Sequence, residues 1–188
     1  MKIILGSKSV GRKQILLDAG YKFEVMAADI DEKAIRSDDY ALLPLLLARA
    51  KAKVLLKIIK TPAILITVDQ VVVWNGELRE KPVNKKQAKA YLKSYNVYPA
   101  QINTAVVVTN TKTGKQKELL DITKAYFQNI PINIIDDLIN EGKVMNAAGG
   151  FIIEHPLLLP YIKQTEGDIK SITGLPLKLT EELIKQVK

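Results

Sequence analysis

Residues 63–74 of the chain read AILITVDQVVVW, and this stretch decides the fold. Its apolar, β-branched composition predicts a long strand, which one polar pair, Asp69-Gln70, interrupts. A carboxylate in an apolar strand is expected to be paired or to coordinate a ligand, because burying it alone is costly. The alternative is that Asp69 ends the strand and caps a turn. Composition alone leaves both interpretations open.

The segments around this strand predict a mixed arrangement of helices and strands. Asn75-Gly76 is a strong hairpin signal directly after it. Asn84, with Gln87 three residues later, predicts a capped helix that ends near Tyr95. Other elements follow from periodicity and turn residues: strands at 2–5, 21–26, 100–110 and 115–130, a short strand at 151–155, and helices at 40–59, 131–142 and 180–187. Helices and strands do not alternate strictly, so we expect a mixed α/β fold.

The loop GSKSVGRK, residues 6–13, lies between the first strand and a helix that runs from Ser9 or Val10 to Ala19. Its glycine spacing resembles a P-loop, G-x-x-x-x-G-K-[ST]. The motif requires Lys where this chain has Arg12, and a magnesium-binding hydroxyl where it has Lys13. A P-loop is therefore not expected. What remains is a Gly/Ser turn at a helix N-terminus beside two basic residues, which suits phosphate or simply caps the helix.

Composition excludes several classes of protein. The chain has 188 residues, no cysteine and a formal net charge of +8. Disulfides, thiolate metal sites and a cysteine nucleophile are absent, and no signal peptide or membrane span is recognisable. The charge favours an anionic partner such as a nucleotide, although lysine-rich helix surfaces account for most of it. No motif for nucleic-acid binding accompanies it, so we do not expect nucleic acid or a membrane as partner.

The candidate acidic residues lie in three places. Asp29, Asp31 and Glu32 belong to a loop after the second strand, and Asp69 interrupts the central strand. Glu154 follows a Gly-Gly pair, where a carboxylate could accept two hydrogen bonds from a base edge, but a solvent-facing residue is the default interpretation. Lys81 precedes a proline, and nothing in its local pattern separates it from a solvated lysine.

These segments together resemble the Maf family of nucleotide pyrophosphatases, also described as septum-formation proteins. The resemblance covers nearly the whole chain, and the matching pieces occur in the family's order. They are Ser7, Ser9, Arg12 and Lys13 in the first loop, Asp31-Glu32, Ala48 with Lys51-Ala52, Asp69, Lys81-Pro82, Ala148-Gly149 and Gly174-Leu175-Pro176. Val10 stands where the family usually has Pro, and Lys13 stands where Arg is frequent.

The resemblance implies a single Maf-like domain over residues 1–188, with an elongated mixed sheet, flanking helices and two lobes around a central cleft, similar to inosine triphosphate pyrophosphatase. It implies a house-cleaning hydrolase that converts a nucleoside triphosphate to the monophosphate and pyrophosphate with Mg²⁺ or Mn²⁺. The implied roles are as follows: Ser7, Arg12, Lys13, Lys51 and Lys81 bind the triphosphate, Glu32 and Asp69 bind the metal, Asp69 also orients water, and Asp69, Glu32 and Lys81 form the catalytic set.

The resemblance also separates two branches of the family. The branch acting on dTTP and UTP typically has Asp-Thr after the central strand and Gln after the Ala-Gly loop, whereas this chain has Gln70 and Glu154. We expect these two residues to bind substrate, and they resemble those of the branch that prefers 7-methyl-GTP. The sequence around them is most similar to that of eukaryotic, plant-like members. A carboxylate accepts both donors of the guanine edge and attracts the positive charge of the methylated base.

Two alternatives to this assignment stay open at this stage. One is a dTTP/UTP-type or broad nucleotide pyrophosphatase. The other, from a different class, is a nucleotide- or nucleic-acid-binding regulator of cell division without turnover. We expect a cytoplasmic protein, and because similar proteins are often dimers, a homodimer is one expectation.

Overall fold

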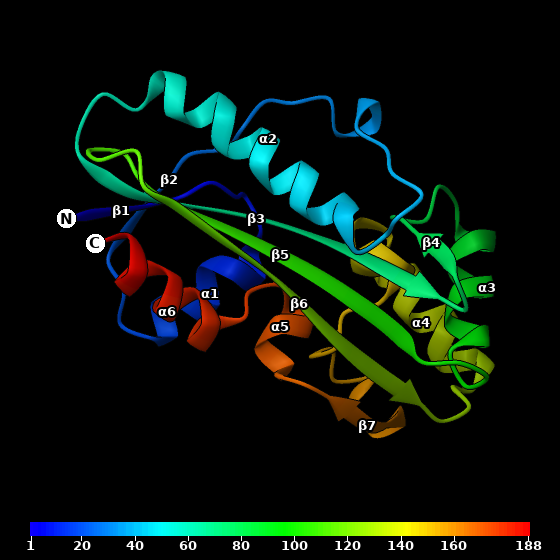
Figure 1. Cartoon of the computed structure of the whole chain (residues 1–188). Helices are drawn as coiled ribbons and strands as arrows, with labels where there is room; N and C mark the ends of the chain where they lie inside the picture. The colour runs from blue at the N-terminus through cyan, green and yellow to red at the C-terminus, as the bar shows by residue number, and fades with distance from the viewer. The chain divides into compact units, whose positions relative to one another are not determined.

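The computed structural model describes all residues, 1–188, and has the mixed α/β architecture predicted from the sequence (Figure 1). Its strands are β1 (Lys2–Leu5), β2 (Phe23–Val25), β3 (Ala63–Trp74), β4 (Glu77–Arg79), β5 (Ala100–Asn110), β6 (Gln116–Phe127) and β7 (Ile162–Glu166). Its α-helices are α1 (Val10–Asp18), α2 (Leu42–Ile58), α3 (Lys85–Ser94), α4 (Ile132–Glu141), α5 (Ile169–Thr173) and α6 (Leu177–Val187). Short 3₁₀ turns are η1 (Glu32–Ala34), η2 (Lys143–Asn146), η3 (Ala148–Gly150) and η4 (Leu159–Tyr161).

The seven strands form one mixed sheet in the order β2-β1-β3-β5-β6-β7, and β4 pairs with β3. β1 pairs in parallel with β2 and with β3, whereas β3–β4 and β6–β7 are antiparallel. Two compact units divide the chain. The first comprises residues 1–69, 104–121 and 174–188, and the second comprises residues 70–103 and 122–173.

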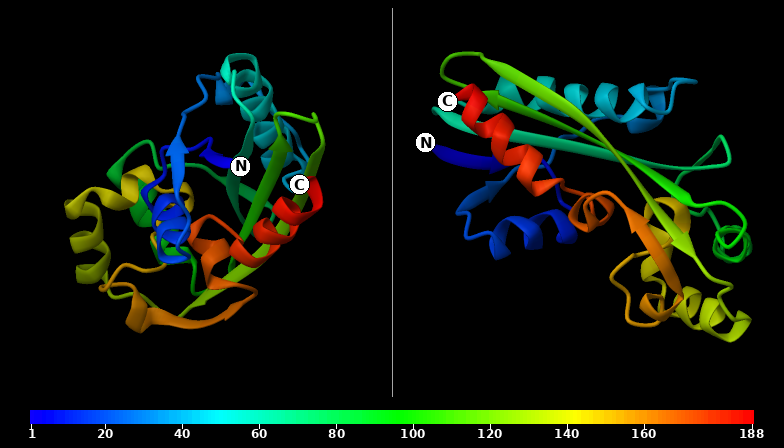
Figure 2. Two further views of the ribbon diagram at one scale, coloured as in Figure 1. Left: turned by 90° about the vertical axis from the view of Figure 1, so that its left-hand side faces the viewer. Right: turned by 60° about the horizontal axis from the view of Figure 1, so that its bottom comes forward.

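In the first unit, helices cover both faces of the strands. Leu55 on α2 packs into one buried cluster with Leu65 of β3. Leu16 on α1 and Leu183 on α6 pack into another cluster, which includes Ile66 of β3. Neighbouring residues of a strand point to opposite faces, and Figures 1 and 2 show α2 on one side of these strands and α1 with α6 on the other. This continuous apolar pattern in β3 is thus explained by burial on both faces.

The second unit has its own core, built around three aromatic rings. The Tyr95 ring lies 5.5 Å from that of Phe127 and 5.3 Å from that of Phe151. α3 and α4 are joined at their surfaces by an ion pair between Lys89 and Asp136, 2.6 Å long. The Asn75-Gly76 hairpin and the Asn84 cap of α3 are confirmed, because Asn84 accepts a hydrogen bond from the Gln87 backbone N–H at 2.8 Å.

In the C-terminal third, one sequence prediction is wrong and two elements were not predicted. Residues 151–155 form turns instead of a short strand, since a backbone bond from His155 N–H to the Ile152 carbonyl closes a tight turn there. β7 and α5 were not expected, because their short polar segments carry little periodicity.

None of the helices combines the length and apolar character needed to cross a membrane.

Candidate active site

Asp69 lies within β3, which continues to Trp74, so the alternative in which it ends the strand is wrong. Residues two apart in a strand share a face, and Leu65 packs on the α2 side. Thr67 follows on the same side and donates a 2.8 Å hydrogen bond to the Ala48 carbonyl of α2. Asp69 comes next in this period and is 7% exposed. The alternation of the strand therefore turns a carboxylate toward α2.

The cation that meets this carboxylate is Lys51, which is 8% exposed on the buried face of α2. Ala48, Ala52 and Leu55 share that face, at the spacing of one helical stripe. Lys53, two positions away, is exposed. No local pattern in the sequence separated these lysines. The helical spacing of Lys51 with Ala48, Ala52 and Leu55 is the signal that could have separated them.

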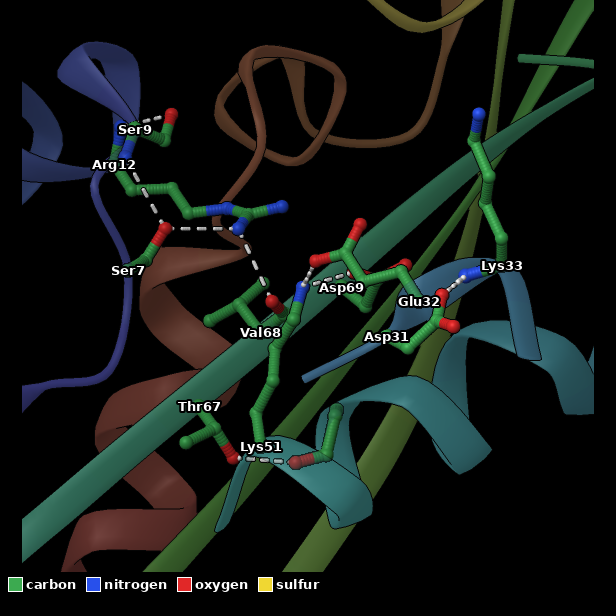
Figure 3. Close-up of polar contacts among 11 residues, drawn as sticks. Ser7, Ser9, Arg12, Asp31, Glu32, Lys33, Lys51, Thr67, Val68 and Asp69 are labelled. Atoms are coloured by element: carbon green, nitrogen blue, oxygen red, sulfur yellow. Dashed lines mark hydrogen bonds and ion pairs between the residues drawn. The ribbon is translucent and has the colours of Figure 1, made fainter. Parts of the chain in front are cut away.

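Lys51 bridges two carboxylates (Figure 3). Its Nζ lies 2.5 Å from Asp69 Oδ1 and 2.8 Å from Glu32 Oε1. Glu32 begins η1, whose first N–H groups are capped by the side chain of Asp31. The Glu32 side chain is 55% exposed, whereas that of Asp69 is 10% exposed. The structure thus brings together three of the residues expected to hold metal and phosphate, with the Lys51 ammonium between the two carboxylates.

Arg12 approaches the same cluster from α1 (Figure 3). Its Nη1 donates to Ser7 Oγ and to the Val68 carbonyl, both at 3.0 Å, and its Nε donates to the Gly174 carbonyl at 3.0 Å. These bonds fix the guanidinium, and Nη2 takes part in none of them. The Arg12 guanidinium, which we expected to bind phosphate, is therefore partly used to join the first loop, β3 and the Gly174-Leu175-Pro176 segment.

The hydroxyl groups of Ser7 and Ser9 accept different hydrogen bonds in the first loop. Ser9 caps α1, with its hydroxyl accepting from the Arg12 N–H at 3.4 Å. Ser7 Oγ accepts from Arg12 Nη1 and from the Ser9 N–H, so its own proton is available to an acceptor. Gly6 before them allows a close approach to β3, because a Cβ there would lie 2.6 Å from Thr67 Cγ2.

Burial and charge act in opposite directions on this cluster. Burial raises the pKa of the Asp69 carboxyl above its usual value, and Lys51 and Arg12 only partly offset that rise. Burial also lowers the pKa of Arg12, opposed by the nearby Asp69 and Glu32. Arginine stays protonated despite such a shift. Two cations thus face two carboxylates, and the cluster is close to neutral when all four are charged.

Lys13 and Lys81 are not drawn into these contacts. Lys13 is partly exposed on α1, and Lys81 is exposed in the second unit, next to the buried Pro82. Their binding of phosphate stays a prediction, as does the cleft between two lobes.

In the second unit, Gln70 and Glu154 are both tied to α5. Gln70 Nε2 donates to the carbonyls of Ser171 and Ile172, at 2.8 and 3.2 Å. Glu154 Oε1 accepts from the Thr173 hydroxyl at 3.0 Å. The amide nitrogen of Gln70, which we expected to meet substrate, is committed to the helix instead. Thr173 was not singled out from sequence, because its contact depends on a helix that periodicity did not predict.

Sequence reasoning also missed Arg79, which is 4% exposed. Its guanidinium carbon lies 3.9 Å from the centre of the Trp74 ring and 4.7 and 4.9 Å from those of Tyr91 and Tyr95. Trp74 is partly buried and packs against the core of the second unit. Tyr95 also donates from its hydroxyl to the Gly149 carbonyl at 2.7 Å.

The chain matches one family model and several known proteins over nearly its whole length. The family model described as Maf-like protein matches residues 2–187. A Dictyostelium discoideum protein named 7-methyl-GTP pyrophosphatase is 48% identical over 98% of this chain and 96% of its own. An Alkaliphilus metalliredigens protein named dTTP/UTP pyrophosphatase is 32% identical over 98% of this chain and 95% of its own.

Among solved structures, a nucleoside-triphosphatase (dITP/XTP pyrophosphatase) from Mycobacterium abscessus is similar at a TM-score of 0.36 and 15% identity, over 70% of this chain and 75% of its own. A likeness at that level supports no functional assignment.

Proposed function

This chain belongs to the Maf family, as its sequence motifs predicted, and we propose that it is a nucleoside triphosphate pyrophosphatase acting on 7-methyl-GTP. The reaction is hydrolysis of the α–β phosphoanhydride, giving 7-methyl-GMP and pyrophosphate. The observation that carries the proposal is the 48% identity, over nearly the full chain, to a protein named for this activity.

The first unit supplies the groups proposed for the triphosphate. Lys51 and Arg12 bring positive charge to one point, and the Ser7 hydroxyl can donate to a phosphate oxygen. Arg12 is held by three bonds to its own chain, so the cation is already oriented before substrate binds. Such preorganised charge is an effective way to stabilise negative charge that develops during phosphoryl transfer.

Glu32 and Asp69 suit a hard divalent cation. Mg²⁺ is usually bound through one or two carboxylates, with substrate phosphates and waters completing the shell. Both carboxylates already share one cation, the Lys51 ammonium, so they converge on a common point. Since Lys51 and Arg12 are balanced by these carboxylates, an anionic triphosphate needs further positive charge. We therefore propose that Glu32 and Asp69 hold Mg²⁺ or Mn²⁺, which when bound would neutralise the phosphates.

Asp69 is proposed to orient the attacking water. Its Oδ1 is occupied by Lys51, and the raised pKa of its carboxyl makes it a better proton acceptor than a solvated aspartate. Glu154 is proposed to read the base, because a carboxylate accepts from N1–H and N2–H₂ of guanine and attracts the positive charge of the 7-methylated ring.

The test measures pyrophosphate release by the purified full chain from 7-methyl-GTP, GTP, dTTP, UTP, CTP and ATP, each with Mg²⁺ or Mn²⁺. We expect the highest kcat/KM for 7-methyl-GTP, and a smaller guanine preference in Glu154→Gln. Preference for dTTP or UTP over both guanine nucleotides would overturn the substrate assignment. Release from none of them, together with salt-dependent binding of RNA or DNA, would instead support a regulator without turnover.

A further inference from the structure

The backbone around Glu154 is fixed, while its side chain is exposed. Ile153 and His155 on either side are 2% and 7% exposed. His155 Nε2 lies 2.9 Å from Glu141 Oε2, and the His155 carbonyl accepts from the N–H of Leu158 at 2.8 Å. The Cα of Glu154 is therefore held in place, and what remains to be set is the direction of its carboxylate.

The Thr173 hydroxyl is the side-chain group that sets this direction. Its Oγ1 lies 3.0 Å from Glu154 Oε1 and 3.1 Å from the Ile169 carbonyl. A hydroxyl has one proton, so it donates to one of these acceptors at a time or shares the proton between them. The carboxylate is the stronger acceptor because it is charged. The bond engages Oε1 and leaves Oε2 to accept from a ligand.

Thr173 is in turn held by Gln70 through α5. This helix has five residues, too few to be stable alone, and its last carbonyls have no partner within the helix. Gln70 Nε2 satisfies two of them, on Ser171 and Ile172, at 2.8 and 3.2 Å. The side chains of these two residues are buried, at 0% and 6% exposure. Gln70 thus anchors the end of α5 that carries Thr173.

We propose that Thr173 is a positioning residue that orients the Glu154 carboxylate for the base of the nucleotide, and that Gln70 fixes Thr173 through α5. This inference rests on the proposed function and names the residues behind its base preference. Gln70 then acts on the base through the helix, by way of two bonds that do not involve substrate. Gln70, Glu154 and Thr173 all belong to the second unit.

The test compares Thr173→Val, which removes the hydroxyl with little change of shape, with Thr173→Ser, which keeps it. Thr165→Val is the matched control, because Thr165 is also partly exposed in the second unit and makes no side-chain hydrogen bond to Glu154. Steady-state kinetics with 7-methyl-GTP, GTP and UTP are measured for each, and the Kd of 7-methyl-GMP is measured by calorimetry. Thermal unfolding shows that each variant is folded.

We expect Thr173→Val to raise KM for 7-methyl-GTP and GTP about fivefold to tenfold, roughly 1–1.4 kcal/mol at 1.4 kcal/mol per factor of ten. Its kcat and its KM for UTP stay near wild type, the Kd of 7-methyl-GMP rises in parallel, and Thr173→Ser restores most of the loss. Gln70→Ala raises the same KM, and adding it to Thr173→Val has little further effect, because both act through one carboxylate.

Equal KM values for Thr173→Val and wild type overturn the inference while leaving the proposed function in place. An equal rise for UTP and the guanine nucleotides also overturns it, because that is the result of a general structural role. Absence of pyrophosphate release from 7-methyl-GTP by the wild-type protein overturns the proposed function, and the inference with it.

Discussion

Removal of the Lys51 ammonium is the sharpest perturbation of the proposed site. Lys51→Met keeps the length of the side chain and its apolar stem on α2 but leaves Asp69 buried without its cation. At 2.5 Å and an effective dielectric constant of about 20, two unit charges attract by about 7 kcal/mol. Desolvation of both ions offsets much of this attraction in the native protein. In the variant the Asp69 desolvation stays and the attraction is lost.

We therefore expect Lys51→Met to lower the free energy of unfolding by about 3–5 kcal/mol at pH 7, as for other buried pairs that lose one partner. Glu32 contributes little to this loss, because its side chain is 55% exposed and can turn to solvent. Asp69→Asn in the Lys51→Met background is expected to recover part of the stability, since no uncompensated charge then remains.

The loss depends on pH in a defined direction. Lys51 lowers the Asp69 pKa, which burial has already raised above its ordinary value of 3.8, so the variant has a still higher folded-state pKa. An acid with a raised folded pKa destabilises the fold when ionised. The extra cost is complete above the folded pKa and shrinks as pH falls toward 3.8.

Urea unfolding of wild type and variant, in EDTA at several pH values, measures this difference. Lys53→Met is the matched control, because it removes an exposed lysine from the same helix. Equal stabilities of Lys51→Met and Lys53→Met at pH 7, or a loss that grows as pH falls, would refute the reasoning.

Three further predictions concern the rest of the molecule. The kcat/KM for pyrophosphate release falls as pH is lowered, because Asp69 becomes protonated. Burial raises the pKa of Asp69, so the midpoint of this fall is expected above pH 3.8, and a midpoint at or below pH 3.8 contradicts the prediction. In urea titrations, Tyr95→Phe lowers the free energy of unfolding by about 1–2 kcal/mol, since the buried Gly149 carbonyl loses its 2.7 Å hydrogen bond. The control Tyr98→Phe changes an exposed ring and alters the free energy of unfolding by less than about 0.5 kcal/mol. Gly149→Ala lowers the free energy of unfolding by about 2 kcal/mol or more, because φ is +70° and the new Cβ would lie 2.7 Å from Tyr95 Oη. Gly20→Ala, with φ +78° and open space around it, lowers the free energy of unfolding by about 1 kcal/mol. Equal losses of thermal stability in the two variants would disprove the clash.

Much of the local structure could be predicted because its causes are local. The Asn75-Gly76 turn, the Asn84 cap and the long apolar strand around Asp69 depend on residues a few positions apart. The region after Gly150 could not be predicted in the same way. Within it, β7 and α5 are held by partners far along the chain, such as the bonds from Gln70 to α5 and the pairing of β7 with β6.

The candidate site shows the same division. Its residue types and their order in the chain were sufficient to predict the Maf family, and the family match confirmed it. The resemblance singled out Lys51, but the residues beside Lys51 and Lys53 are alike, so the neighbouring sequence did not show that Lys51 meets Asp69. The period of α2 places Lys51 against the sheet, and the period of β3 turns Asp69 to the same side.

The sequence by itself determined the family, the class of fold and the set of chemically competent side chains. Only the tertiary structure decided how those side chains are paired: Lys51 between Asp69 and Glu32, Arg12 partly committed to backbone carbonyls, and Thr173 against Glu154. The physical reason is that the chemical type of a side chain depends on a single position of the sequence. Its direction, desolvation and partner depend on elements that packing brings together from distant parts of the chain.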